Sequence, residues 1–281
     1  MVLPANVTVK VNDAGKLYLD PLPTFTLTAT GLVNGDTAPA VFGGMTFQTS
    51  ATASSNVGTY PVYLTGAVGA ENYSVGFLSG TLTIAPRPSA TTLQRTGPNP
   101  STYGQTVGFT VTVSSTLGAP SGTVTLLRGD VVLATATLTN GQVSFNLSSL
   151  SVGSHPLSAQ YAGSGGFAAS SSPFISHTVN RASTATLLTS SLNPSKSGQA
   201  VTFTAIVNPV APGAGTVIGS VEFLRGGVVI ATVPLSSGSA LLTTSALAVG
   251  KHSIQARYVA TTNWAASASP VLQQTVKGGG K

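Results

Sequence analysis

The sequence predicts an all-β fold made of tandem small β-sandwiches, on three observations. Short stretches alternate apolar and polar residues and are bounded by Gly, Pro or Asn, which is typical of half-buried strands. The stretch from Ser121 to Gly129 returns, altered but recognisable, from Ile218 to Gly226. No segment of useful length carries the 3.6-residue apolar period of an amphipathic helix. The chain is therefore expected to be a tandem array.

The N-terminal part begins with a strand at residues 5–11, where Val7, Val9 and Val11 alternate with polar neighbours. Residues 17–23 are expected to be a turn-rich link, because each of their prolines fixes φ and removes an amide donor. A turn, or a short helical turn, is expected around Asn34-Gly35. Further strands are predicted at 24–30, 58–64, 73–77 and 80–84.

Two aligned copies follow a short stiff link at residues 85–88. Asn99 aligns with Asn193 and, beyond an insertion at 209–215, Val124 aligns with Val221. Each copy holds about seven short strands in ~95 residues, the pattern of a β-sandwich. The inward positions predicted for the first copy are Val107, Phe109, Val111, Val113, Val124, Leu126, Leu157, Ala159 and Tyr161. Those predicted for the second copy are Val201, Phe203, Ala205, Val207, Val221, Phe223, Ile254, Ala256 and Tyr258.

The composition restricts the function classes. Charged residues are 6% of the 281, against roughly 25% in an ordinary soluble domain. The net charge is +6 with scattered Lys and Arg, so no nucleic-acid partner is expected. Cysteine is absent, which excludes disulfides, thiolate metal sites and cysteine nucleophiles. No stretch approaches the ~18 apolar residues of a membrane span, and no signal peptide is recognised.

Titratable residues form no recognisable site. The six acids are dispersed, whereas calcium requires several carboxylates among its oxygen ligands. His155 and His252 occupy equivalent repeat positions after a turn glycine, which indicates an architectural role near the rim of each sandwich; His177 is the third histidine. The usual hydrolase, zinc and phosphate-loop motifs are missing. We expect no enzyme activity, no catalytic or metal residues and no cofactor.

Three local features have a structural and a functional interpretation. Arg128-Gly129-Asp130 spells the tripeptide read by integrins and should lie at a hairpin tip, but the second copy has Arg225-Gly226-Gly227, so Arg-Gly is interpreted as the turn. Whether a receptor ever reads it stays open. Lys10 lies out of phase with the inward valines and should face solvent, which argues against a Lys–Asn isopeptide bond. Trp264, matched by Phe167, is predicted to fill the core rather than to stack on a sugar.

The N-terminal part resembles an MBG domain through Tyr18…Asp20-Pro21, Gly31–Thr37, Val57–Tyr60, Asn72-Tyr73 and Gly80–Ile84. One departure is Leu19, where that family's usual Tyr-Gly pair would place glycine. Residues 89–180 and 183–277 resemble bacterial Ig-like repeats of the Big_3 and Big_5 type, through Gly122-Thr-Val, Gly153–Tyr161 and their counterparts. These resemblances imply β-rich modules of large secreted or cell-surface bacterial proteins, often used as stalks.

We therefore expect an MBG-like domain at 1–86, Ig-like sandwiches at 87–181 and 182–277, and a flexible tail at 278–281, cut from a longer polypeptide. Three modules of about 30–40 Å each would reach roughly 100 Å end to end. The expected function is a non-catalytic stalk or spacer, monomeric, with neighbouring domains of the parent protein as its partners. Two alternatives remain: an adhesin or glycan-binding module, and a fibre subunit that assembles through edge strands.

Overall fold

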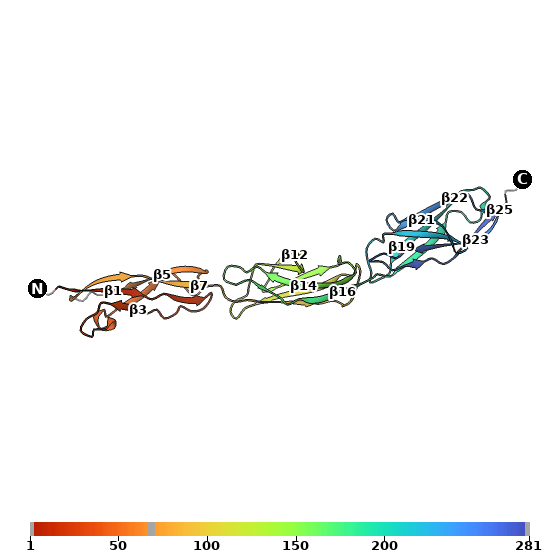
Figure 1. Ribbon diagram of the computed structural model, residues 1–281. Helices are drawn as coiled ribbons and strands as arrows, with labels where there is room; N and C mark the ends of the chain where they lie inside the picture. Colours follow the sequence, from red (N-terminus) through yellow and green to blue (C-terminus); the bar gives the residue numbers. More distant parts are fainter. Residues whose placement is uncertain (1–2, 67–70, 279–281) are drawn as a thin grey trace. The chain divides into compact units, whose positions relative to one another are not determined.

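The structure, a computed structural model, describes residues 3–66 and 71–278 (Figure 1). This part of the chain is built of β-strands and one short helix, α1 (Ala38–Val41), which confirms the all-β prediction. The chain divides into two compact units. The first unit comprises residues 1–93, 111–143 and 158–173, and the second comprises residues 94–110, 144–157 and 174–281.

The N-terminal module, strands β1 to β7 of the first unit, has two sheets. One sheet has the order β3-β1-β6, with β3 (Leu27–Thr30) antiparallel and β6 (Tyr73–Leu78) parallel to β1 (Ala5–Val11). The other has the order β2-β7-β5-β4, formed by β2 (Ala14–Leu17), β7 (Gly80–Ala85), β5 (Gly58–Thr65) and β4 (Thr46–Thr49). Strands β3 and β4 are each at the edge of a sheet.

The strands predicted from strong alternation are confirmed, and the misses have local causes. Val7, Val9 and Val11 are buried as expected, and Lys10 is exposed. The strand predicted at 24–30 is shorter, because β1 ends at Val11, which pairs with Leu27, so residues 24–26 have no β1 residue to pair with. Strands β2 and β4 and helix α1 are only four residues each, too short to show a period.

The first repeat is formed by strands β8 to β16. Its strands are β8 (Ala90–Arg95), β9 (Ser101–Thr102), β10 (Val107–Ser114), β11 (Thr123–Arg128), β12 (Val131–Thr137), β13 (Gln142–Leu147), β14 (Gly153–Tyr161), β15 (Ser170–Ser171) and β16 (Ile175–Asn180). They form sheets of order β13-β10-β8 and β12-β11-β14-β16-β9, with β15 added on β14.

The second repeat, strands β17 to β25, has the same strand order. Its strands are β17 (Thr184–Ser190), β18 (Ser195–Lys196), β19 (Val201–Pro209), β20 (Ser220–Arg225), β21 (Val228–Pro234), β22 (Ser239–Thr244), β23 (Gly250–Tyr258), β24 (Ser267–Ala268) and β25 (Leu272–Lys277). Its sheets are β17-β19-β22 and β18-β25-β23-β20-β21, with β24 added on β23. Two facing sheets of this order make an Ig-like sandwich.

The inward positions predicted in both repeats are confirmed: each of the eighteen named side chains is at most 2% exposed. Such burial of aliphatic and aromatic side chains supplies most of the stability of a sandwich, about 1.5–3 kcal/mol for each large side chain.

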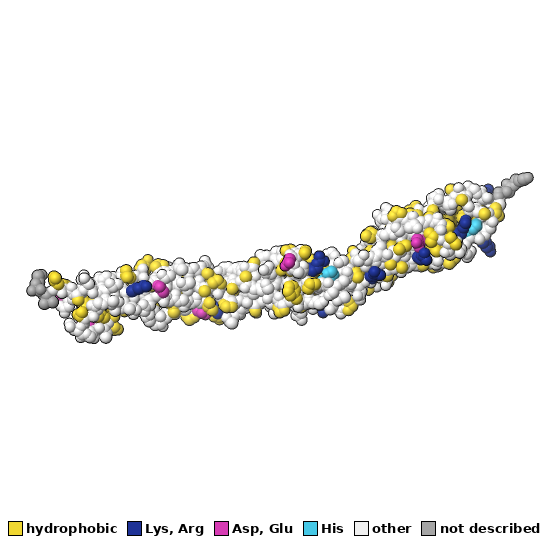
Figure 2. Space-filling view, viewed as in Figure 1, with side chains coloured by type: hydrophobic (Ala, Val, Ile, Leu, Met, Phe, Trp, Pro, Cys, Tyr) yellow, Lys and Arg dark blue, Asp and Glu magenta, His cyan; other side chains and the backbone are white. Residues whose placement is uncertain are grey.

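The surface is mostly uncharged. Figure 2 shows that the charged side chains on one face are scattered, with hydrophobic and uncharged polar groups between them. Among the described residues, no helix is long and apolar enough to cross a membrane.

Candidate functional site: three equivalent turns and an apolar groove

The same four-residue turn occurs three times, and we call these the coupling turns: residues 17–20, 102–105 and 196–199. Each begins at the end of a short strand that pairs in parallel with the last strand of its sandwich. The pairs are β2 with β7, β9 with β16, and β18 with β25. The turns therefore lie where the chain leaves each sandwich.

Their hydrogen bonds are equivalent. In each turn, the backbone amide of the second residue donates to the backbone carbonyl of the last residue of the paired strand. The three bonds run from Tyr18 to Ala85 at 2.9 Å, from Tyr103 to Asn180 at 2.8 Å and from Ser197 to Lys277 at 2.9 Å. The side-chain oxygen of the fourth residue accepts from the amide of the first: Asp20 from Leu17 at 3.3 Å, Gln105 from Thr102 at 3.0 Å, and Gln199 from Lys196 at 3.0 Å. Each turn is therefore closed by its own fourth residue.

The third residue of each coupling turn has a positive φ. Leu19 has φ 71°, Gly104 has φ 83° and Gly198 has φ 79°. Glycine adopts this conformation without strain, whereas leucine does not. Leu19 nevertheless keeps the backbone of the turn, so its departure from the Tyr-Gly pair leaves the local structure intact.

Arg87 joins the first coupling turn to the linker within the first unit. Its side chain is buried; Nε donates to the Tyr18 carbonyl at 2.7 Å, Nη1 donates to Thr116 Oγ1 at 2.9 Å, and Nη2 donates to Asp20 Oδ1. The hydrogen bond from Arg87 holds the pKa of the Asp20 carboxyl below its usual value. A buried arginine with three partners fixes the position of the linker backbone.

The linker backbone is also paired with the loop that carries Phe167. The Arg87 amide donates to the Gly166 carbonyl at 2.8 Å, and the Ala168 amide donates to the Arg87 carbonyl at 2.9 Å. The rings of Tyr18 and Phe167 meet edge to face, with centroids 5.7 Å apart and planes at 81°. A Cβ at residue 166 would overlap the Tyr18 ring, so only glycine permits this approach.

The second unit repeats this arrangement around Ala182. The Ala182 amide donates to the Asn263 carbonyl at 3.0 Å, and the Ala265 amide donates to the Ala182 carbonyl at 2.9 Å. Tyr103 meets Trp264 edge to face, with centroids 5.1 Å apart and planes at 86°. Trp264 is 2% exposed within the core of the second repeat, which confirms the prediction that it fills the core.

The sequence predicts Phe167 and Trp264 as equivalent positions but does not predict the tyrosines that contact them. Tyr18, Tyr103 and Arg87 carry no repeat signal of their own, because each is replaced elsewhere: Ser197 takes the tyrosine position and Ala182 takes the arginine position. The dipeptide Gly104-Gln105, repeated as Gly198-Gln199, is the sequence signal that could have located the second and third turns.

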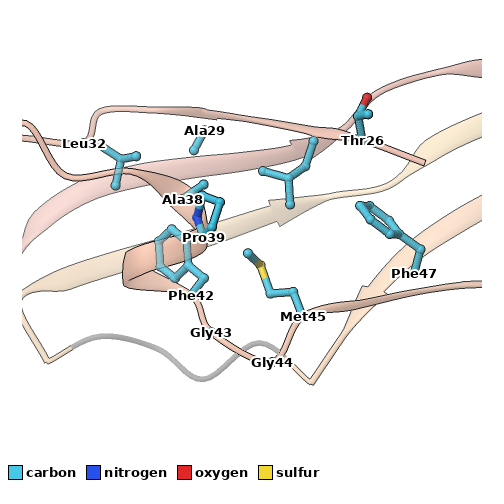
Figure 3. A pocket seen from close by; sticks show the side chains of 11 residues that line it. Thr26, Ala29, Leu32, Ala38, Pro39, Phe42, Gly43, Gly44, Met45 and Phe47 are labelled. Atoms are coloured by element: carbon cyan, nitrogen blue, oxygen red, sulfur yellow. The ribbon is translucent and has the colours of Figure 1, made fainter. Parts of the chain in front are cut away.

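The N-terminal module has an apolar groove of about 590 Å³ between edge strands β3 and β4, at α1 (Figure 3). Its lining residues are Thr26, Leu27, Ala29, Leu32, Ala38, Pro39, Phe42, Gly43, Gly44, Met45 and Phe47. None of these residues is charged, so the groove suits an apolar, uncharged ligand rather than an ionic one. It offers no acid, base or nucleophile.

The histidines have structural environments. His155 Nε2 lies 2.7 Å from the Ser151 carbonyl, and His252 Nε2 lies 2.8 Å from the Ala248 carbonyl, so the equivalence of these two positions is confirmed. His177 is buried, lies 3.0 Å from Ser101 Oγ and packs edge to face on Phe109. Burial lowers the pKa of His177 below its usual value.

The remaining sequence candidates also have defined positions. Arg128 ends β11, and Gly129 and Asp130 form an exposed turn before β12, so the hairpin prediction is confirmed. Gly129 and its counterpart Gly226 have φ 57° and 58°, so the repeat conserves the turn conformation. Over residues 3–66 and 71–278, no three His, Asp or Glu side chains cluster to hold a metal ion.

Comparison with known proteins identifies the modules. Residues 7–83 match the MBG domain (YGX type), and residues 93–180 and 188–277 each match the bacterial Ig-like domain (group 3). No curated protein matches the sequence.

Similar solved structures are distant. Fibronectin(III)-like modules of Clostridium thermocellum CbhA are 19% identical, with 66% of this chain and 94% of that chain covered and a TM-score of 0.29. The Escherichia coli adhesin FdeC is 13% identical, with 99% and 98% covered and a TM-score of 0.28. The D0-D1 domain of intimin is 17% identical, with 65% and 97% covered and a TM-score of 0.26. At these values the likeness carries no information on function.

The family matches cover well over half of the chain and agree with the repeated strand order. The chain belongs to the bacterial Ig-like domain (group 3) family, with an MBG domain preceding its two Ig-like domains.

Proposed function

We propose that this chain is a non-catalytic stalk or spacer segment of a large bacterial secreted or cell-surface protein, with domains at 1–86, 87–181 and 182–277 and neighbouring domains of the parent protein as its partners. The families support this proposal, because bacterial Ig-like and MBG modules are typical of surface proteins.

One observation carries the proposal: both linkers are paired with the loop of the repeat that follows. Arg87 and Ala182 each make two backbone hydrogen bonds to the loop that carries Phe167 or Trp264. A free linker would leave these backbone groups in water and would let neighbouring domains move independently. Paired linkers limit bending, which is the mechanical requirement for a spacer.

The chemistry of the surface agrees with a spacing role. Asp13, Asp20, Asp36 and Glu222 each accept a hydrogen bond from a backbone amide or a side chain of their own unit. These carboxylates therefore hold turns and strands of their own unit, and no two of these four share a hydrogen-bond donor as a paired acid and base would.

The spacer function can be tested by displaying the segment on bacteria, between a membrane anchor and a receptor-binding tip. Removing one repeat, residues 88–182, should reduce capture of a receptor held behind a thick glycan layer, and replacing that repeat with an unrelated Ig-like domain should restore capture. The spacer function would be overturned if receptor capture did not change when one repeat was removed. It would also be overturned if an unrelated Ig-like domain failed to restore capture.

The groove of the N-terminal module supports a second candidate, an adhesin that binds an apolar ligand. Ala29→Lys would place a charge in the groove, whereas Thr28→Lys changes the exposed neighbour on the same strand. Binding of the intact chain to host cells that A29K loses and T28K keeps would favour this function. No binding by the intact chain would remove it.

Exposed valines on edge strands support a third candidate function, self-assembly into a fibre. Val131 and Val132 on β12 are 52% and 60% exposed, and Val228 and Val229 on β21 are 69% and 42% exposed. Uncharged edges of this kind can pair between chains. A molar mass by light scattering that stays monomeric as the concentration rises would exclude it.

A further inference from the structure

The coupling turn has the same structure in two different kinds of domain. The turn at 17–20 belongs to the MBG domain and the turn at 102–105 belongs to an Ig-like domain, yet their backbone hydrogen bonds and positive-φ residue coincide. What the two turns share is therefore not the sandwich that carries them. They share their contacts with the linker and with the aromatic loop of the repeat that follows.

Both turns also meet the same feature of the following repeat. Phe167 and Trp264 are equivalent repeat positions, and each is met edge to face by the tyrosine at the second turn position. The linker residues Arg87 and Ala182 pair in parallel with these same two aromatic residues. Edge-to-face aromatic pairs are directional, so they fix an orientation as well as adding contact area.

The third turn differs at the position that makes this contact. Ser197 stands where Tyr18 and Tyr103 stand. The backbone of the turn is complete, with the Ser197 amide bonded to the Lys277 carbonyl. Only the ring is missing.

We propose that the coupling turn is an interchangeable docking site whose partner is an Ig-like domain with an aromatic residue at the Phe167/Trp264 position. The second turn residue sets the specificity: tyrosine supplies the ring that packs against the aromatic loop, and serine has no ring. Since the partner binds through its loop and linker, an MBG turn and an Ig-like turn are equivalent acceptors. The inference deepens the proposed spacer function, because it names the contact that orders the linkers.

Trp264 is the only tryptophan in the chain, so its fluorescence reports the second contact directly. In the full chain, Tyr103→Ser gives the second turn the residue of the third turn. We expect the quenching of Trp264 by acrylamide to rise several-fold with an unchanged far-UV circular dichroism spectrum. Tyr103→Phe should keep the low quenching, because it retains the ring. Tyr63→Ser, at an exposed tyrosine of the MBG domain, is the matched control and should have no effect.

Interchangeability is tested by deleting residues 88–182, which joins Arg87 to Ser183 and brings the first coupling turn before the second repeat. Trp264 should be as protected from acrylamide as in the full chain, and Tyr18→Ser in the shortened chain should expose it. In the full chain, where Trp264 faces Tyr103, Tyr18→Ser should leave Trp264 protected.

The proposal is overturned if Trp264 stays protected in full-length Y103S, or if the correctly folded shortened chain leaves Trp264 exposed. These results are distinct from failure of the spacer function. A chain can couple its domains as described and still show no dependence of receptor capture on repeat number.

Discussion

Leu19 has the backbone conformation that Gly104 has at the same position of the next coupling turn, with φ 71° against φ 83°. Leucine in this conformation costs roughly 1–2 kcal/mol relative to the right-handed region. The hydrogen bonds of Tyr18, Asp20 and Arg87 hold the turn against this cost. Leu19 replaces the glycine that is usual in MBG domains, and the turn keeps its backbone conformation because neighbouring residues hold it by hydrogen bonds.

Substitution by alanine should have different costs at Gly104 and Gly198, although their φ angles are close, at 83° and 79°. At Gly198 nothing lies within 4 Å of an added Cβ, whereas at Gly104 the added Cβ would overlap the backbone of Ala214. We expect Gly198→Ala to lower the free energy of unfolding by about 1 kcal/mol, the cost of a left-handed alanine. Gly104→Ala should cost distinctly more. Chemical denaturation followed by circular dichroism measures both, and equal costs would show that the second turn does not meet Ala214.

The ion pair between Asp20 and Arg87 should give an acid-dependent contact. The pKa of Asp20 lies below its ordinary 3.8 in the folded protein, chiefly because Arg87 donates to it. The stabilisation is present above about pH 3.8 and is lost as the pH falls through the lowered pKa. An NMR titration should show the pKa of Asp20 rising in Arg87→Ala, and no rise would contradict the pairing.

Acid should also weaken the first repeat through His177. Burial holds its folded pKa below the 6.5 of an exposed histidine, with smaller effects from the charges of Arg95 and His155. The unfolded chain then binds the proton more readily, so stability falls as the pH drops below about 6.5. The second repeat has Gln274 at this position, hydrogen-bonded to Ser190 and to the Leu192 carbonyl.

His177→Gln gives the first repeat the residue that the second repeat has at this position, Gln274. The substitution should reduce the fall in melting temperature between pH 7 and pH 5. His252→Gln is the matched control, because His252 is only partly buried at the rim, and it should leave the fall unchanged. A pH dependence that persists in H177Q would show that other groups cause it.

The sequence predicts the sandwiches better than the contacts between linker and turn. Strand alternation locates Phe109 and Phe203 in the core because burial of one face imposes a period of two. Repetition locates Phe167 and Trp264 as equivalent positions. Repetition does not reveal Tyr18 as the partner of Phe167, because these two residues are far apart in the chain. Their contact also depends on the short parallel pairing of β2 with β7. Strand β2 is too short to leave a pattern.

The coupling free energy between Tyr103 and Trp264 tests the central claim most directly. A double-mutant cycle of Tyr103→Ser and Trp264→Leu, measured by denaturant unfolding of the full chain, should give a coupling of about 0.5–1.5 kcal/mol, as for other aromatic pairs. The same cycle with Tyr63→Ser in place of Tyr103→Ser should give none. A Tyr103–Trp264 coupling indistinguishable from that control would contradict the role of the coupling turn.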